Sequence, residues 1–305
     1  MSFALGVALL AVVTAVTCAL PGTYVVLRRS SMLVDAISHA VLPGIVLGYL
    51  LTRDLDSPVL ILGAALAGML VVLGAEWLGR TGLLTGDAPQ GLIFPALFSI
   101  GVILVTLNAA NVHLDTHAVL VGDLNLAAWD QLEIAGLALG PRYLYLMLGM
   151  LVLNAVVLAL LHRTLTLTTF DPVFARTIGI RSGLVNAVFM LLVALTVTAA
   201  YNAAGAILVI ALVVIPPATA RLLTDRLPVM LGFAAGIAAA GALAGFWLAY
   251  VLDAATSAGM ATFYGLAFGV VLLATRLRRR EGREMVRNAR ASTPGAPSRG
   301  LRRLS

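Results

Sequence analysis

The chain has 305 residues, of which 61% are hydrophobic and only 11% are charged, and its mean hydropathy is +1.01. A soluble domain carries about a quarter of charged residues, so this composition excludes an ordinary soluble protein and indicates a polytopic helical membrane protein. The net charge of +6 is concentrated at the carboxyl end, because residues 276–303 hold ten of the 20 basic residues and only two glutamates. All 20 basic residues are arginine.

Nine segments are apolar enough to cross a bilayer, which takes about 20 helical residues. They are residues 3–27, 31–52, 58–79, 91–109, 141–161, 182–200, 203–222, 227–252 and 259–276. We therefore predict an all-α transmembrane bundle over residues 1–276 and a basic, disordered tail over residues 277–305. Only Tyr201 and Asn202 separate the sixth and seventh spans, so eight spans are the alternative. The moderately apolar segment 119–139 could also enter the membrane.

The positions of the arginines predict the orientation, since cytoplasmic loops are enriched in basic residues. With nine spans and an external amino terminus, eighteen arginines face the cytoplasm and only Arg53 and Arg142 face outward. The carboxyl-terminal tail is then cytoplasmic. We expect its arginines to lie near anionic lipid headgroups rather than to bind nucleic acid.

Asp35 and His39 are ionisable residues within the second predicted span, four residues apart and therefore on one helix face. An ionisable side chain in hydrocarbon is costly and marks a candidate functional site. A carboxylate beside an imidazole suits a divalent transition metal. Pro43 lacks an N–H, so it also leaves the carbonyl of His39 without its helical donor and predicts a kink. Further metal ligands would have to come from water, another helix or a second copy of the chain. A structural pair and a proton relay are the alternatives.

A second group of polar residues, His113, Asp115 and His117, lies in a predicted external loop. It could capture a cation with low affinity. An ordinary solvated loop, or one that contacts a partner protein, explains the same residues.

Residues 169–180 lie between the fifth and sixth spans, on the predicted cytoplasmic side. Asp171 suits the N-cap of a helix, Pro172 its first position and Gly179 its end, which predicts a short helix of about two turns. Its apolar residues, Phe174 among them, predict a helix that lies on the membrane or docks in a partner's groove.

Pro216 and Pro217 interrupt the seventh span and remove two helical hydrogen bonds. Such a kink can be a hinge in a transporter, or a static feature.

The chain contains no phosphate-binding loop, no dinucleotide fingerprint and no His-Glu-x-x-His motif. It therefore shows no means of hydrolysing ATP itself.

Four stretches resemble the permease subunits of bacterial ABC importers for manganese, zinc and iron. They are Gly22-Thr-Tyr-Val-Val-Leu-Arg-Arg29 with Val34-Asp-Ala-Ile-Ser-His-Ala-Val-Leu-Pro-Gly44, Gly86-Asp-Ala-Pro-Gln-Gly91 with Phe98-Ser-Ile-Gly-Val-Ile103, Phe170-Asp-Pro-Val-Phe-Ala-Arg-Thr-Ile-Gly179, and Ile207-Leu-Val-Ile-Ala-Leu-Val-Val-Ile-Pro-Pro-Ala-Thr-Ala220. The stretches occur in the family's order and cover about residues 20–275.

The resemblance implies a homodimeric permease in the bacterial cytoplasmic membrane, with two ATPase subunits and an extracytoplasmic metal-binding protein as partners. It implies that the permease is not itself an enzyme and that the metal is a transported substrate rather than a resident cofactor. Asp35 and His39 are then the metal ligands in the pore. The resemblance also implies that residues 171–179 form the coupling helix, with Asp171, Pro172, Phe174, Ala175, Arg176 and Gly179 as its key residues.

Oxygen and imidazole ligands without thiolate suit manganese, iron or zinc, and we favour manganese. Two other transporters remain as alternatives. One is an ABC permease for a chelated metal, and the other is a proton-coupled secondary transporter that uses Asp35 and His39 as a relay.

Overall fold

The computed structural model describes residues 3–54, 57–84, 88–108, 124–134 and 137–291, which are mostly helical. In chain order the elements are α1 (Phe3–Leu27), α2 (Ser31–Thr52), α3 (Pro58–Arg80), α4 (Ala88–Asn108), α6 (Leu124–Trp129), β1 (Gln131–Ile134), β2 (Leu137–Pro141), α7 (Arg142–Phe170), α8 (Pro172–Thr177), α9 (Ser182–Leu223), α10 (Leu227–Val251) and α11 (Thr256–Ala291). Within this described part, nine helical segments are long and apolar enough to span a membrane, which confirms the predicted number.

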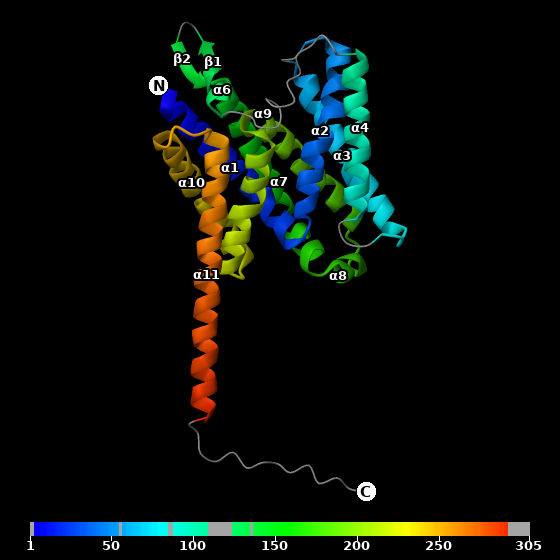
Figure 1. Ribbon diagram of the computed structural model, residues 1–305. Helices are drawn as coiled ribbons and strands as arrows, with labels where there is room; N and C mark the ends of the chain where they lie inside the picture. The colour runs from blue at the N-terminus through cyan, green and yellow to red at the C-terminus, as the bar shows by residue number, and fades with distance from the viewer. Residues whose placement is uncertain (1–2, 55–56, 85–87, 109–123, 135–136, 292–305) are drawn as a thin grey trace.

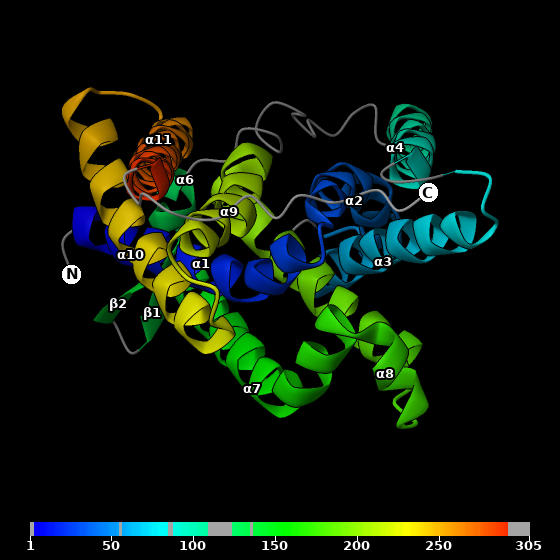
Figure 2. The ribbon, with the colours of Figure 1, turned by 90° about the horizontal axis from the view of Figure 1, so that it is seen from below.

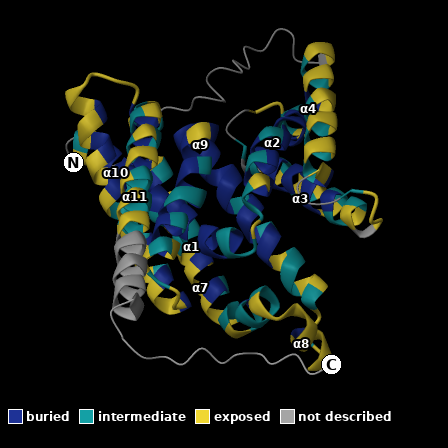
Figure 3. Ribbon diagram, turned by 60° about the horizontal axis from the view of Figure 1, so that its bottom comes forward, coloured by how far each residue is buried: buried dark blue, intermediate teal, exposed yellow. Residues whose placement is uncertain are grey.

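The helices form two groups around a central pair. α1 packs against α7, α9 and α10, whereas α2 packs against α3, α4 and α9. Seen along the bundle, α2, α3 and α4 lie on one side and α10 and α11 on the other, with α1 and α9 between them (Figure 2). The buried core accordingly follows α1 and α9, and α4 is largely exposed (Figure 3).

α9 contains two spans, Ser182–Tyr201 and Ala203–Leu223, which confirms that the least certain predicted pair consists of separate segments. Its backbone leaves the helical conformation at Gly205, where φ is 77° and ψ is 163°. Only glycine adopts this region without a large steric cost, so the break lies at Gly205 and not at the polar Tyr201–Asn202 junction. Both halves of α9 approach the α8 end of the bundle, at the bottom of Figure 1.

Two local features depart from the expectations. The short strands β1 and β2 pair antiparallel beside the otherwise helical bundle. α11 continues as a helix to Ala291, beyond the predicted end of the last span. Arginine, glutamate, methionine and alanine dominate this extension, and all four are good helix formers. Residues 292–305 lie outside the described residues.

Glycines allow the closest helix contacts. A Cβ on Gly22 of α1 would overlap the carbonyl oxygen of Val213 in α9, and a Cβ on Gly44 of α2 would overlap that of Gly63 in α3. Pro217 has no N–H to donate to the Val213 carbonyl, so this oxygen is directed at α1 instead of being used within its own helix. Small residues at such points let backbones approach, and that contact holds helices together in lipid.

We expect Gly22→Ala to destabilise the fold by about 1–3 kcal/mol, because α1 and α9 must separate to accept the methyl group. Thermal unfolding in detergent measures this loss. Gly149→Ala is the matched control, since nothing lies within 4 Å of a Cβ at Gly149 on α7. Equal unfolding temperatures for the two variants would show that the α1–α9 contact is loose.

Candidate transport site and coupling segment

Asp35 and His39 lie on one face of α2, as their spacing predicts. The Asp35 Oδ1 and His39 Nε2 atoms are 3.5 Å apart, and about a third of each side chain is exposed, 32% and 34% respectively. The His39 ring stacks on Phe94 of α4, with centroids 5.6 Å apart, and meets Phe98 edge-on at 6.3 Å. The two phenylalanines thus support one side of the imidazole, while both polar groups keep an open side.

The pair supplies two ligands of a metal site. Among the described residues, no group of three or more His, Cys, Asp or Glu side chains is placed to hold a metal ion. Two ligands give incomplete coordination, so a cation here needs water or groups from another chain. His113, Asp115 and His117 lie outside the described residues, and their suggested capture of cations stays a prediction.

The three prolines proposed to kink the spans all lie within helical segments. α2 passes through Pro43 without a break, and Gly101 of α4 packs directly on that ring: a Cβ at Gly101 would lie 2.8 Å from the Pro43 Cδ. Pro216 and Pro217 lie within the second half of α9, and the non-helical residue of this helix is Gly205. Their role in gating stays a prediction.

Residues 171–179, which the resemblance predicts to be a coupling helix, fold locally as the sequence predicts. The Asp171 Oδ1 accepts a hydrogen bond of 2.9 Å from the Phe174 N–H, and Pro172 follows as the first residue of α8. At the other end Gly179 has a φ of 82°. The N–H groups of Gly179 and Ile180 donate to the carbonyls of Arg176 and Ala175, at 3.1 and 3.0 Å. This pattern is a Schellman motif, which ends the helix with its last carbonyls satisfied.

α8 presents an apolar surface at its end of the bundle. Val173, Phe174 and Ile178 are 72%, 50% and 51% exposed, whereas Ala175 is buried. The Arg176 Nε donates to the Ser182 Oγ at 3.4 Å, which links α8 to the first residue of α9. Exposed apolar side chains on a short, well-capped helix suit insertion into a groove.

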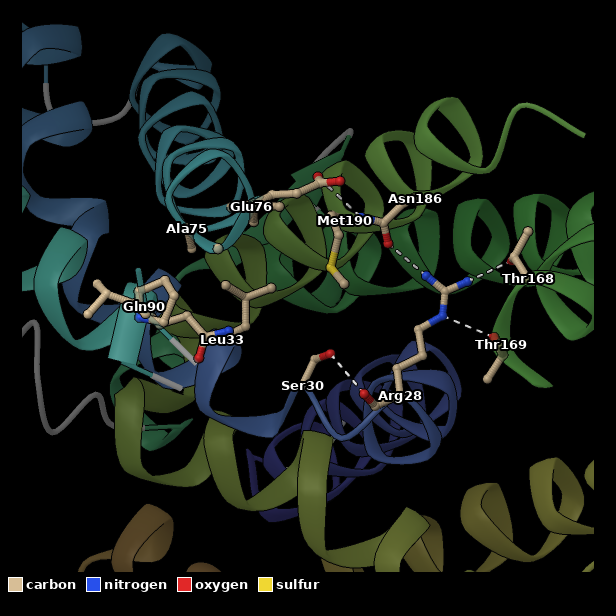
Figure 4. A pocket seen from close by; sticks show the side chains of 14 residues that line it. Arg28, Ser30, Leu33, Ala75, Glu76, Gln90, Thr168, Thr169, Asn186 and Met190 are labelled. Atoms are coloured by element: carbon tan, nitrogen blue, oxygen red, sulfur yellow. Dashed lines mark hydrogen bonds between the residues drawn. The ribbon is translucent and has the colours of Figure 1, made fainter. Parts of the chain in front are cut away.

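A polar cluster that sequence reasoning missed connects this segment to the rest of the bundle. Arg28, in the turn after α1, donates to Thr169 Oγ1 at 3.0 Å, Thr168 Oγ1 at 3.1 Å and Asn186 Oδ1 at 2.8 Å (Figure 4). The Asn186 Nδ2 in turn donates to the Glu76 Oε2 of α3 at 3.5 Å. Glu76 is an acidic residue inside a predicted span, so the reasoning applied to Asp35 could have found it.

Two cavities flank this cluster. One of about 680 Å³ is lined by Arg28, Glu76, Gln90 and Asn186 among others, and a second of about 200 Å³ reaches Pro172 and Arg176. Burial lowers the pKa of the Arg28 guanidinium, and the nearby Tyr24 opposes this shift. Arginine nevertheless stays protonated in proteins, so the cluster holds a permanent positive charge.

Comparison with known proteins identifies the family. Residues 1–275 match the ABC 3 transport family, and the chain belongs to it. The zinc transport system membrane protein TroD of Treponema pallidum is 47% identical over 88% of this chain and 72% of its own length. The manganese transport system membrane protein MntD of Bacillus subtilis is 38% identical over 90% and 92%. The solved PsaBC complex of Streptococcus pneumoniae with a Fab shares the fold, with a TM-score of 0.73, 22% identity and coverage of 89% and 91%.

We expect Gly179→Ala to loosen α8, because a side chain at positive φ costs about 1–2 kcal/mol. Hydrogen–deuterium exchange of peptides covering residues 172–180 should become faster. Gly183→Ala is the control, since Gly183 lies in the first turn of α9 with open space around its Cα. Unchanged exchange in Gly179→Ala would mean that the Schellman motif does not limit opening of α8.

Proposed function

We propose that the chain is the membrane-spanning permease of an ATP-driven importer for a divalent transition metal ion. The observation that carries this proposal is the Asp35–His39 pair on α2, with its polar atoms 3.5 Å apart and a third of each side chain open. A neutral imidazole and a carboxylate bind Mn²⁺, Fe²⁺ or Zn²⁺, and incomplete coordination by one chain favours release. Membership of the ABC 3 transport family supports the transport class.

The proposed substrate is manganese in preference to zinc or iron. The relatives named above are a zinc and a manganese transport protein, so similarity alone does not separate these metals. The site offers oxygen and imidazole and no thiolate, and hard oxygen ligands suit Mn²⁺ better than they suit Zn²⁺. The ion is the transported substrate, and no resident cofactor is proposed.

The proposed assembly is a homodimer in the bacterial cytoplasmic membrane, with the amino terminus outside. Two-fold symmetry would bring a second Asp35–His39 pair to the pore and complete the coordination. Two ATPase subunits would dock at the α8 end, and an extracytoplasmic metal-binding protein at the opposite end would deliver the ion. In the topology predicted from the sequence, eighteen arginines fall on the cytoplasmic side, which supports this orientation.

The proposed ATPase contact is the exposed apolar surface of α8. Val173, Phe174 and Ile178 would insert into a groove of the ATPase, and the caps at Asp171 and Gly179 would keep the helix formed as it is pushed. The chain has no ATP-hydrolysing motif of its own, which agrees with catalysis on separate subunits.

We expect cells that lack their own importer to accumulate one divalent metal when they express this chain with its ATPase and binding protein. Asp35→Asn should lower that accumulation about tenfold or more, because a ligand is lost. Mass spectrometry of whole-cell metal content is the measurement. Asp225→Asn is the matched control, since the Asp225 side chain is 91% exposed and pairs with Arg221. Equal accumulation by Asp35→Asn and wild type at equal membrane abundance would make the pair structural.

We expect Phe174→Ala to reduce uptake by roughly thirtyfold while the permease still folds, because buried aromatic side chains dominate such interfaces. Co-purification of the ATPase with the permease measures the contact directly. Phe233→Ala on α10 removes a phenylalanine of similar exposure, 46%, away from α8 and should have no effect. Uptake that continues without any ATPase, and follows a proton gradient, would favour a secondary transporter.

A further inference from the structure

We propose that Arg28 is a positioning residue that transmits movement of the α8 segment to α2, the helix that carries Asp35 and His39. This inference rests on the proposed function, because it assumes that an ATPase moves α8. It assigns to one side chain the connection between the docking surface and the candidate metal site.

Arg28 holds both ends of the coupling segment at once. Thr168 and Thr169 belong to the last turn of α7, directly before α8, and Asn186 belongs to the first turns of α9, directly after it. The guanidinium donates to all three, at 3.1, 3.0 and 2.8 Å, and its carbon lies 4.8 Å from the centroid of the Phe189 ring. The donor directions of the planar guanidinium are fixed, so its hydrogen bonds change when either flanking segment moves. A flexible lysine would adjust to such a movement.

The turn that carries Arg28 is stiff. The N–H groups of Arg29 and Ser30 donate to the carbonyls of Val26 and Val25, at 3.1 and 3.0 Å, and Arg29 has a φ of 56°. This is a second Schellman motif. The Ser30 carbonyl then accepts from the Leu33 N–H at 3.1 Å, so α2 begins without a flexible linker.

Asp35 follows Arg28 by seven residues, and most of that interval is regular helix. In the proposal, a displacement of the guanidinium is transmitted through this stiff turn to the base of α2. The same cluster reaches α3, since Asn186 also donates to Glu76 at 3.5 Å. α2 and α3 pack closely at Gly44 and Gly63, so the two helices are held together at that level and linked near their base through Arg28, Asn186 and Glu76.

Space for a second arrangement lies beside the cluster. The cavity of about 200 Å³ is lined by Arg28 and Asn186 together with Pro172 and Arg176 of the α8 segment. A hydrogen-bonded group next to unfilled volume can exchange partners when α8 is pushed toward it, whereas a fully packed group cannot. Coupling of this kind requires an element with two discrete arrangements, and we assign that role to the Arg28 cluster.

The test compares Arg28→Gln with Arg29→Gln. The second variant removes the same charge from the next residue, whose side chain is exposed. The permease, its ATPase and its binding protein are reconstituted in proteoliposomes, and uptake of radiolabelled Mn²⁺ and Zn²⁺ is measured together with ATP hydrolysis. We expect Arg28→Gln to lower the ions imported per ATP by between about twofold and thirtyfold, the range typical of coupling mutations, and Arg29→Gln to leave this ratio unchanged. Loss of folded protein lowers uptake and hydrolysis together, so the ratio isolates coupling from stability.

A second variant protects the test against misfolding. Thr168→Val with Thr169→Val removes the acceptors on α7 and leaves the charge and the Asn186 contact in place. Its effect on the ratio should not add to that of Arg28→Gln, because both act on one interaction. A wild-type ratio in Arg28→Gln, or an equal fall in uptake and hydrolysis in both sets of variants, overturns the proposal. Absence of Mn²⁺ or Zn²⁺ uptake by the wild-type assembly would instead refute the proposed function.

Discussion

Close backbone contact between helices is the constraint on which this structure depends. In lipid, burying apolar side chains between helices brings no hydrophobic free energy. Close packing therefore decides which helices associate. Gly22 against Val213 fixes α1 on α9, Gly44 against Gly63 fixes α2 on α3, and Gly101 against Pro43 fixes α4 on α2. The position of Asp35 and His39 follows from the last two contacts, because they set where α2 stands.

Two kinds of polar side chain inside the bundle contrast with each other. Asn154 is fully buried, donates to the Thr17 carbonyl at 3.0 Å and accepts from Thr196 at 3.0 Å, so it joins α1, α7 and α9 with its groups satisfied. A buried amide that is paired on both its donor and its acceptor side stabilises the bundle. Asp35 and His39 differ, since a third of each remains open. This contrast in exposure supports a structural role for the first kind and a transport role for the second.

Sequence patterns predicted the features that depend on neighbouring residues. The nine spans follow from apolar runs, the caps of α8 from Asp171 and Gly179, and the shared face of Asp35 and His39 from helical spacing. Contacts between distant segments were not predictable in this way. Arg28 finds its partners 140, 141 and 158 residues further along the chain, and no local pattern carries that information. The sequence placed the junction of the sixth and seventh spans at the polar Tyr201 and Asn202. The helix breaks a few residues later, at Gly205, because backbone conformation decides its position.

α11 is longer than a membrane span requires, so its length determines how far its end stands from the lipid. Its 36 residues extend about 54 Å at 1.5 Å per residue, well beyond a hydrocarbon core of about 30 Å. In Figure 1 the excess projects past α8, at the same end of the bundle. The 14 residues after Leu277 then rise about 21 Å, so the end of the helix stands between two and three Debye lengths from the headgroups at physiological ionic strength. Salt therefore screens most of the potential of the lipid surface by the level of Ala291, the last residue of α11.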